Sequence, residues 1–401
     1  MVNLLLAVIY VAFISLGLPD AVLGAAWPTM SVDLGAPISW AGGISMTISA
    51  GTIVSALLSD RMTLRFGAGK VTAVSVALTA LALFGFSVAP NYWVLILLAI
   101  PYGLGAGGVD AALNNYVAIH YESRHMSWLH AMWGIGALIG PYVMGFALGA
   151  GQGWPWGYRY ISILQVALTA VLIFSLPLWK KRSEVKTGEV SGESDGTANN
   201  ETRKPLSVRG VLAIRGAKEI LVMFFCYCAL ESTAMLWGSS YMVLGKGIDK
   251  TTAATWASLF CIGITVGRLV SGFLTMKFDD PTMIRLGQAL VLAGIVSMLL
   301  PLPHNIGTIM GLMVIGLGCA PIYPCVIHST PAYFGEDKSQ AIVGMQMACA
   351  YVGSMCMPPV FGLIAQHVSV LWFPLYMLVF LVLMVIMHES LRKKCAGQTI
   401  G

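Results

Sequence analysis

Twelve long apolar runs, separated by short stretches of charged, glycine or proline residues, take up most of this 401-residue sequence. A helix needs about 20 mostly apolar residues to cross a bilayer, and each run is about that long or longer. Helices satisfy their own backbone hydrogen bonds, so the runs predict an all-α integral membrane protein with twelve transmembrane helices. The predicted spans are 4–28, 38–59, 70–89, 93–119, 127–149, 160–179, 218–244, 252–276, 282–301, 306–330, 339–366 and 370–390.

The composition argues against a water-soluble fold. Hydrophobic residues make up 57% of the chain and charged residues only 10%, against roughly 25% charged in a typical soluble domain. The net charge of +5 does not indicate nucleic-acid binding, because the basic residues are scattered over loops without interleaved aromatics. The first apolar run, 4–26, is too long for a signal peptide and has no basic flank before it, so we expect a retained first helix.

The cysteines and histidines do not form the patterns of a metal or catalytic site. Cys226 and Cys228 lie too close on one helix to suit a metal, and His304 and His328 have no acid or cysteine at ligand spacing. We therefore expect no metal, no cofactor and no disulfide. A nucleophile with its base is also missing from the pattern, so the chain is not predicted to be an enzyme. The cysteines inside apolar runs are Cys226, Cys228, Cys261, Cys319, Cys325, Cys349 and Cys356.

A hydrophilic segment divides the twelve spans into two sets of six. Residues 180–217 begin with basic residues and continue through Ser, Gly, Glu, Thr and Asn, a composition that cannot bury a core. We interpret this segment as a flexible cytoplasmic linker. It separates an N-terminal six-helix bundle over 1–179 from a C-terminal six-helix bundle over 218–391, and a cytoplasmic tail covers 392–401.

The distribution of Lys and Arg predicts the orientation. If both termini are cytoplasmic, only Arg159, Lys246 and Lys250 lie outside. The positive-inside rule therefore predicts cytoplasmic termini. We expect a monomer in the plasma (inner) membrane. The basic residues then inside are Arg61, Arg65, Lys70, Arg124, the linker cluster, Lys277, Arg285, Lys338 and Arg392 to Lys394.

The two halves repeat the same small residues at offsets of 213 to 217 positions. Six spans in each half give both repeats the same orientation, so we expect two parallel repeats that can rock about a central cavity. The matching pairs are Gly51 and Gly267, Ser55 and Ser271, Gly103 and Gly316, Gly105 and Gly318, Gly136 and Gly353, Pro141 and Pro358, and Gly145 and Gly362.

This arrangement resembles the major facilitator superfamily. Ser59-Asp60-Arg61 with Arg65 looks like a degraded form of the signature between its second and third helices, and 267–272 (GRLVSG) is the counterpart. Within the superfamily, the chain is similar to the fucose–proton symporters and their sodium–glucose relatives. The segments that carry this similarity are 17–20 (GLPD), 103–117 (GLGAGGVDAALNNYV), 130–141 (HAMWGIGALIGP), 231–241 (ESTAMLWGSSY) and 320–325 (APIYPC). The chain departs from that group at Asn115, where the group usually has proline.

Three acids lie deep in apolar spans: Asp20, Asp110 and Glu231. A carboxylate at the bilayer centre costs about 3 kcal/mol even on the gentlest scale, so such acids usually face a cavity or bind an ion. The resemblance implies proton coupling and sugar recognition for Asp20 and Asp110. Asp110 and Asn114 share one helix face, which could hold a proton beside a substrate hydroxyl. The alternative for each acid is a neutral group that only fixes helix packing.

Several further residues are candidates for substrate binding. His130 aligns with a polar sugar contact of the resembled group, and Trp133 lies one turn away. The mid-span amides Gln165 and Gln346 fit either cavity lining or hydrogen bonding between helices. The other candidates are Asn115, Trp237, Tyr241 and Tyr323, with Trp27 and Tyr241 also fitting an interfacial aromatic belt. A predicted gating network at cytoplasmic helix ends contains Asp60, Arg61 and Arg268.

These features predict a secondary active transporter that works by alternating access. With Arg268 placed towards the cytoplasmic end of its span, no Lys or Arg is expected at mid-membrane depth, which favours a neutral polar solute, a monosaccharide, carried with a proton. Three acids could also attract a cation, so a cationic drug/proton antiporter is the alternative. Sodium-coupled and uncoupled sugar transport also stay open, as do the direction of transport and the acid that carries the coupling ion.

Overall fold

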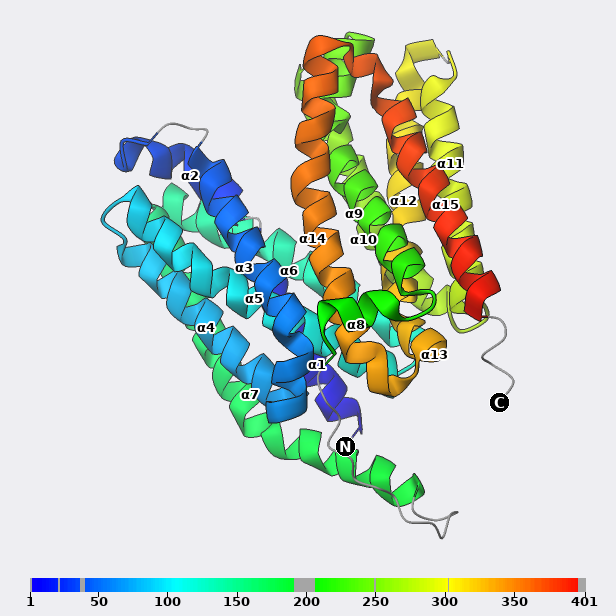
Figure 1. Cartoon of the computed structure of the whole chain (residues 1–401). Coiled ribbons are helices and arrows are strands. Elements are labelled where there is room, and N and C mark those ends of the chain that lie inside the picture. Colours follow the sequence, from blue (N-terminus) through cyan, green and yellow to red (C-terminus); the bar gives the residue numbers. More distant parts are fainter. Residues whose placement is uncertain are drawn as a thin grey trace. The chain divides into compact units, whose positions relative to one another are not determined.

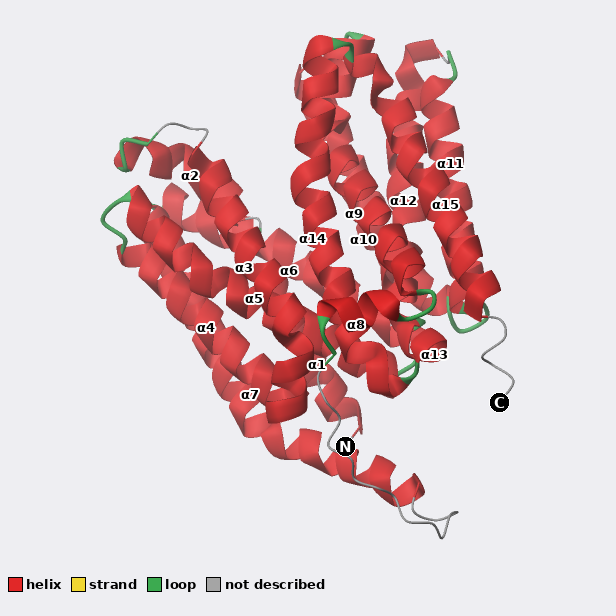
Figure 2. Cartoon of the chain, in the orientation of Figure 1, coloured by secondary structure: helices red, strands yellow, loops and turns green. Residues whose placement is uncertain are grey.

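The computed structural model describes residues 2–20, 22–36, 40–190, 206–248, 250–301 and 303–395. Over these residues the chain forms helices joined by short loops, and no strand occurs among them (Figure 2). The predicted all-α class is confirmed. The α-helices are α1 Val2–Gly17, α2 Val22–Asp33, α3 Ala41–Phe66, α4 Ala68–Val88, α5 Tyr92–His120, α6 Ser123–Gly149, α7 Trp154–Val190, α8 Val208–Ala213, α9 Ala217–Ser240, α10 Lys250–Leu274, α11 Asp280–Leu299, α12 Ile306–His328, α13 Thr330–Phe334, α14 Glu336–His367 and α15 Phe373–Cys395 (Figure 1).

Eleven segments of the described chain are long and apolar enough to cross a membrane. The remaining predicted span, 252–276, corresponds to α10, whose apolar part covers Leu259–Leu274. Each of the twelve predicted spans therefore coincides with helical structure. The bounds shift at several ends, most clearly in α3, which continues to Phe66, and in α7, which begins at Trp154.

The first span is broken where it was predicted to be continuous. α1 ends at Gly17 and α2 begins at Val22. Pro19 has no backbone N–H and disfavours helical geometry at the residue before it. Between the two helices, the amides of Asp20 and Val22 instead bond three residues back, at 3.2 Å each. The break places Asp20 in a turn rather than within a helix.

The predicted linker is partly helical. α7 continues past the end of the sixth span to Val190, and α8 covers Val208–Ala213. Lys and Glu favour helix even without a core to bury, which explains the extension. The rest of the proposed flexible stretch, 191–205, lies outside the described residues.

The chain forms two compact units whose boundary differs from the division between the sequence halves. Unit 1 contains Met1–Tyr116 and Met132–Ser207, and unit 2 contains Val117–Ala131 and Val208–Gly401. The end of α5 and the start of α6 therefore pack with the second set of helices. We call the segment Val117–Ala131 the α5–α6 hairpin.

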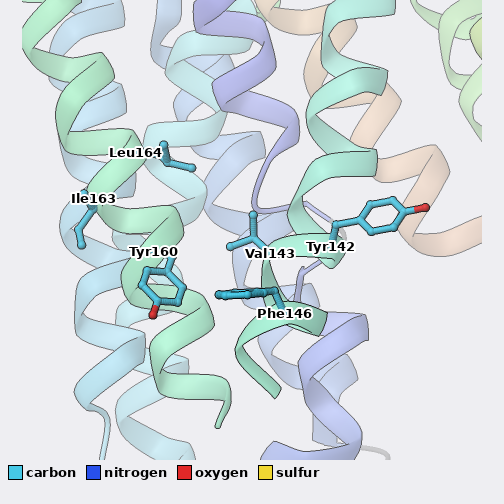
Figure 3. Close-up of a pocket in the computed structure, with 6 residues that line it drawn as sticks. All are labelled: Tyr142, Val143, Phe146, Tyr160, Ile163 and Leu164. Carbon is cyan, nitrogen blue, oxygen red and sulfur yellow. The ribbon is translucent and has the colours of Figure 1, made fainter. Parts of the chain in front are cut away.

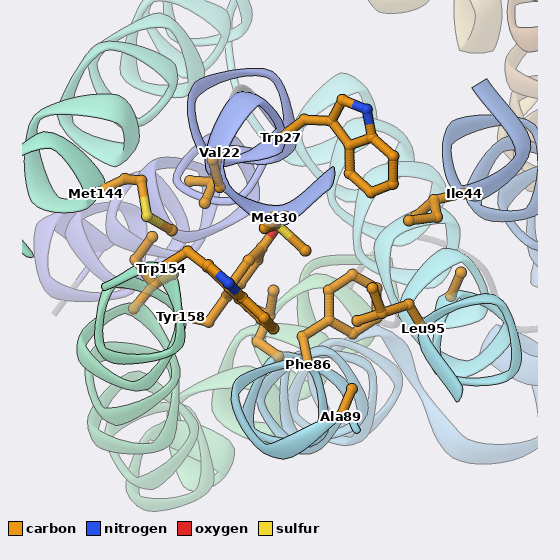
Figure 4. Packing of buried hydrophobic residues seen from close by; sticks show 14 of the residues in the cluster. Val22, Trp27, Met30, Ile44, Phe86, Ala89, Leu95, Met144, Trp154 and Tyr158 are labelled. Atoms are coloured by element: carbon orange, nitrogen blue, oxygen red, sulfur yellow. The ribbon is translucent and has the colours of Figure 1, made fainter. Parts of the chain in front are cut away.

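Aromatic and branched side chains fill the core of unit 1 (Figure 4). Trp27 and Met30 of α2 lie in this core with Phe86 of α4 and Tyr158 of α7, and each is at most 4% exposed. Trp27 is therefore a core residue, and the interfacial alternative does not describe it. The core holds α2 against the helices that follow the break at Pro19.

The internal repeat appears as matching helix crossings in the two units. A methyl group on Gly103 would lie 2.1 Å from the carbonyl oxygen of Ile48 in α3, and one on Gly316 would lie 2.3 Å from that of Phe260 in α10. The helices thus touch backbone to backbone, as small residues allow in membrane proteins. Gly105 and Gly318 make equivalent close approaches to α4 and α11. The predicted internal repeat is confirmed at these crossings.

Candidate functional site

Asp20 lies in the turn between α1 and α2 with two aromatic hydrogen-bond donors. The indole Nε1–H of Trp133 in α6 donates to one carboxylate oxygen at 2.8 Å, and the hydroxyl of Tyr102 in α5 donates to the other at 3.3 Å. Asp20 remains exposed although both oxygens are bonded. The arrangement presents a carboxylate beside two aromatic rings, all within unit 1.

Asp110 and Asn114 face the interior of unit 1 and bond to each other. The Asn114 amide donates to the Asp110 carboxylate at 2.7 Å and to its backbone carbonyl at 2.9 Å. Asp110 is 5% exposed and Asn114 is fully buried, and Asn115 beside them is also buried. The predicted shared face is present. The amide nitrogen of Asn114 is engaged by Asp110, and solute binding by Asn114 stays a prediction.

Glu231 of α9 forms an ion pair with Arg268 of α10. Their nearest side-chain atoms are 3.3 Å apart, with the two side chains 17% and 5% exposed. Arg268 was predicted at a cytoplasmic gate, with no basic group at the depth of the acids. The expectation of no basic group beside the acids is wrong, because the long side chain of Arg268 extends from its helix to Glu231, whereas the gating role of Arg268 stays a prediction. The charge of Glu231 is therefore compensated within unit 2.

An aromatic cluster lies in the same unit as this pair. Tyr323 of α12 is at its centre, with ring centroids 4.5 Å from His130, 4.7 Å from Phe224 and 5.7 Å from Tyr227. The Tyr323 hydroxyl donates to the sulfur of Met347 at 3.3 Å. His130 is 4% exposed. The structure thus places His130 with Tyr323 in unit 2 and Trp133 with Asp20 in unit 1.

The comparison with known protein families settles what kind of protein this is. The family model of the Major Facilitator Superfamily matches residues 9–246 and 220–393. The chain belongs to the major facilitator superfamily. Its members are transporters, so the helices described above cross a membrane several times and the chain is not an enzyme.

Three known proteins illustrate what the chain is similar to. The solved structure of the fucose:proton symporter of E. coli matches with a TM-score of 0.74 at 14% identity, over 98% of both chains; this match shows a shared fold. The glucose/mannose transporter of Bacillus subtilis is 22% identical over 285 residues, covering 69% of this chain and 67% of that protein. A probable multidrug-efflux transporter of Mycobacterium tuberculosis is 29% identical over 150 residues, covering 36% of this chain and 31% of that protein.

The two glutamine candidates hydrogen-bond within the helical bundles of this superfamily member. Gln165 is 1% exposed, and its side chain both donates to the Ser15 carbonyl at 2.6 Å and accepts from the Ser15 hydroxyl at 2.5 Å, joining α7 to α1. Gln346 is fully buried and accepts from the Thr330 hydroxyl at 3.1 Å. Both fit the alternative in which the amide ties helices together.

Two predicted aromatic contacts pack inside unit 2. The Trp237 indole donates to the Pro358 carbonyl at 2.9 Å, joining α9 to α14. Tyr241 lies in a π-helical turn over Tyr241–Gly245, is 2% exposed, and stacks near Phe373 at 5.2 Å. The burial of Tyr241 argues against an interfacial belt for this residue.

The remaining gating candidates lie at the end of α3. Asp60 is 3% exposed and accepts a hydrogen bond from the backbone amide of Leu206 at 3.1 Å, which connects α3 to the segment before α8. Arg61 is exposed. Asp60 thus anchors the chain that leads into the second set of helices.

A groove between α6 and α7 is apolar and contains none of the predicted site residues. It has a volume of about 490 Å³, and Tyr142, Phe146, Tyr160 and Ile163 line it (Figure 3). Its exposed surface is almost entirely apolar and offers a polar solute few hydrogen-bond partners. It is not the candidate substrate site.

Tyr102 and Phe224 lie beside the predicted site residues but were not predicted from the sequence. Tyr102 directly precedes the Gly103-Leu104-Gly105 segment on the helix of Asp110, and Phe224 lies two turns before Glu231. Their positions on the helices of the named acids were the available signal. The partners across the helix crossings could not be read from one helix alone.

Proposed function

We propose that this transporter carries a monosaccharide together with a proton by alternating access. The observation that carries the proposal is the exposed Asp20 carboxylate with the Trp133 indole and the Tyr102 phenol around it. A carboxylate accepts hydrogen bonds from sugar hydroxyls, and an aromatic ring packs against the apolar face of a pyranose. The names of the fucose:proton symporter and the glucose/mannose transporter support the same solute class.

In this proposal the acids have separate roles. Asp20 contacts the solute because it is exposed, and Asp110 carries the coupling proton because it is buried beside the amide of Asn114. Burial makes a charged carboxylate costly, which favours proton uptake and release during a cycle. Glu231 is the rival proton carrier. Its pairing with Arg268 means that protonation would also release a basic side chain.

The presence of Arg268 changes the argument for a neutral solute. A lack of basic groups near the acids can no longer support a neutral solute. The pairing of Arg268 with Glu231 supports it instead, because a guanidinium already paired with a carboxylate is a weaker site for an anionic solute. We therefore retain a neutral sugar and expect sugar phosphates to be poor substrates.

Radiolabelled uptake into proteoliposomes tests the proposal. A panel of neutral hexoses, sugar phosphates and organic anions should be offered under imposed proton and sodium gradients separately. We expect neutral hexoses to accumulate with the proton gradient. Accumulation with sodium alone, or uptake that only equilibrates, would assign sodium coupling or uncoupled transport instead.

The second candidate is export of lipophilic cations in exchange for protons. The observation that favours it is the 150-residue match to a probable multidrug-efflux transporter. The same proteoliposomes distinguish the two functions. Proton-driven movement of a lipophilic cation, with no hexose uptake, would replace the sugar proposal.

A further inference from the structure

The end of α12 holds the α5–α6 hairpin through a histidine with two acceptors. His328 is the last residue of α12, and its Nε2 lies 3.0 Å from the backbone carbonyl oxygen of Tyr121 in the hairpin. Its Nδ1 lies 2.5 Å from a carboxylate oxygen of Asp280, the first residue of α11. The other carboxylate oxygen of Asp280 accepts a hydrogen bond from the hydroxyl of Ser123, also in the hairpin.

For His328 to hydrogen-bond to both Tyr121 and Asp280, the two side chains must hold one proton more than a neutral imidazole and an ionised carboxylate do. A carbonyl oxygen only accepts, so Nε2 must carry a hydrogen. A neutral ring would then present the lone pair of Nδ1 to the carboxylate of Asp280, which is repulsive. A proton shared between Nδ1 and the carboxylate removes the repulsion and forms a charge-assisted bond.

The two helix ends favour this proton on the histidine. Asp280 stands in the first turn of α11, where the helix dipole stabilises a negative charge, and His328 stands in the last turn of α12, where it stabilises a positive charge. The side chains are 10% and 20% exposed. The site is therefore shielded yet open enough to exchange a proton with water.

We infer that His328 and Asp280 form a proton-binding site that locks the α5–α6 hairpin onto α11 and α12. When the proton leaves Nδ1 for water, the ring can no longer donate to both Tyr121 and Asp280. Either the bond to Tyr121 in the hairpin is then lost, or the bond between His328 and Asp280, which fixes the two helix ends that hold the hairpin. The lock is closed at low pH and released as pH rises.

A second contact shows what the lock covers. The Ser123 hydroxyl lies 3.8 Å from the sulfur of Cys325, which is fully buried one turn before His328. The hairpin also packs on α10, where the Trp128 indole donates to the Leu269 carbonyl at 3.4 Å. The same indole lies so close to Gly272 that a methyl group there would clash with it. Release of the hairpin should expose the Cys325 thiol.

Other titratable groups surround the site and need separate control. From the hairpin these are Glu122, which pairs with Arg124 at 3.0 Å, and His125, whose ring meets that of Tyr121. From the helices they are the Asp279 cap of α11, Tyr333 of α13 and Cys325 itself. His125→Gln removes the nearest other imidazole and leaves both His328 contacts in place.

The inference goes beyond the proposed function, because it needs neither a sugar nor coupling to a gradient. Under the predicted topology the site faces the cytoplasm. Acidification of the cytoplasm would then hold the hairpin in place and slow the cycle. Protons that enter with a solute would thus slow further transport.

The first test measures the proton directly. ¹⁵N-histidine NMR of the purified full chain should show His328, assigned by comparison with the variants, with both ring nitrogens protonated at about pH 6 and losing one proton as pH rises. That signal should be absent from His328→Gln and present in His125→Gln. A neutral His328 throughout would overturn the proton site.

The second test measures the lock, in a chain whose only cysteine is Cys325. The rate of N-ethylmaleimide reaction is compared with that of the same chain carrying His328→Gln, so that the intrinsic pH dependence of the thiol cancels. We expect about tenfold slower reaction in the parent at pH 6, the effect of one charge-assisted hydrogen bond, and similar rates at pH 9. Ser123→Ala should keep this pH dependence. A parent-to-variant ratio independent of pH would refute the lock.

Discussion

Removing Arg268 should destabilise the folded chain less at low pH, whereas removing Glu231 should destabilise it at any pH. The reason is that a glutamate can be neutralised by a proton and an arginine cannot. In Arg268→Gln, a buried glutamate is left without its partner. Neutralising an ordinary glutamate costs about 1.4 kcal/mol for each pH unit above its pKa of about 4.3. The loss of stability is therefore limited to about 4 kcal/mol at pH 7 and about 1 kcal/mol at pH 5.

In Glu231→Gln the unpaired group is the guanidinium, which stays charged at any accessible pH. The Arg268 side chain is only 5% exposed. We therefore expect the loss of about 3 to 5 kcal/mol seen for broken buried pairs, at pH 5 as well as at pH 7. The double variant Glu231→Gln, Arg268→Gln should lose less than the sum of the two.

The assay is denaturant unfolding of the purified chain in micelles at both pH values. The control is Arg285→Gln, which breaks the bidentate pair with Glu389 where the side chains are 50% and 37% exposed. That change should have little effect on stability, because an exposed pair is screened by water and contributes little. If Arg268→Gln is as costly at pH 5 as at pH 7, the pair is not the buried ion pair described here.

Asp110→Asn keeps the hydrogen-bonding shape but removes the titratable charge, so uphill accumulation should be lost while equilibrium exchange persists; continued accumulation would exclude Asp110 as the proton carrier. Gly103→Ala should lower the melting temperature of the purified chain, because the methyl would lie 2.1 Å from the Ile48 carbonyl, whereas Gly145→Ala faces open space and should be neutral. Single cysteines placed in 180–217 should react with impermeant maleimide only from the cytoplasm, and labelling of intact cells would reverse the predicted orientation.

The features that the sequence predicted well are periodic or repeated along the chain. Apolar runs of helix-spanning length located the twelve spans, and the constant offset between glycines such as Gly103 and Gly316 located equivalent crossings. An apolar run is read from one segment, and the offset is read by comparing the two halves of the same sequence. Neither signal requires knowledge of which helices are neighbours.

The features that the sequence did not predict depend on contacts between distant segments. The position of Arg268 on its helix gave no indication that its side chain would reach Glu231, since a long flexible side chain spans several ångströms beyond its backbone. The membership of 117–131 in the second unit, and the pairing of Tyr102 with Asp20, likewise arise from tertiary packing. The break at Pro19 was visible in principle, because proline marks a helix boundary.

Direct backbone contact at Gly103 and Gly316 limits where new variants of this protein can arise. Between most packed helices, side chains absorb small changes by adopting other rotamers. Gly103 in α5 faces the backbone of Ile48 in α3, and Gly316 in α12 faces the backbone of Phe260 in α10, so no side chain fits at either position. Substitutions selected for a new solute should therefore accumulate on the other faces of these four helices, while the two glycines stay unchanged through every round of selection.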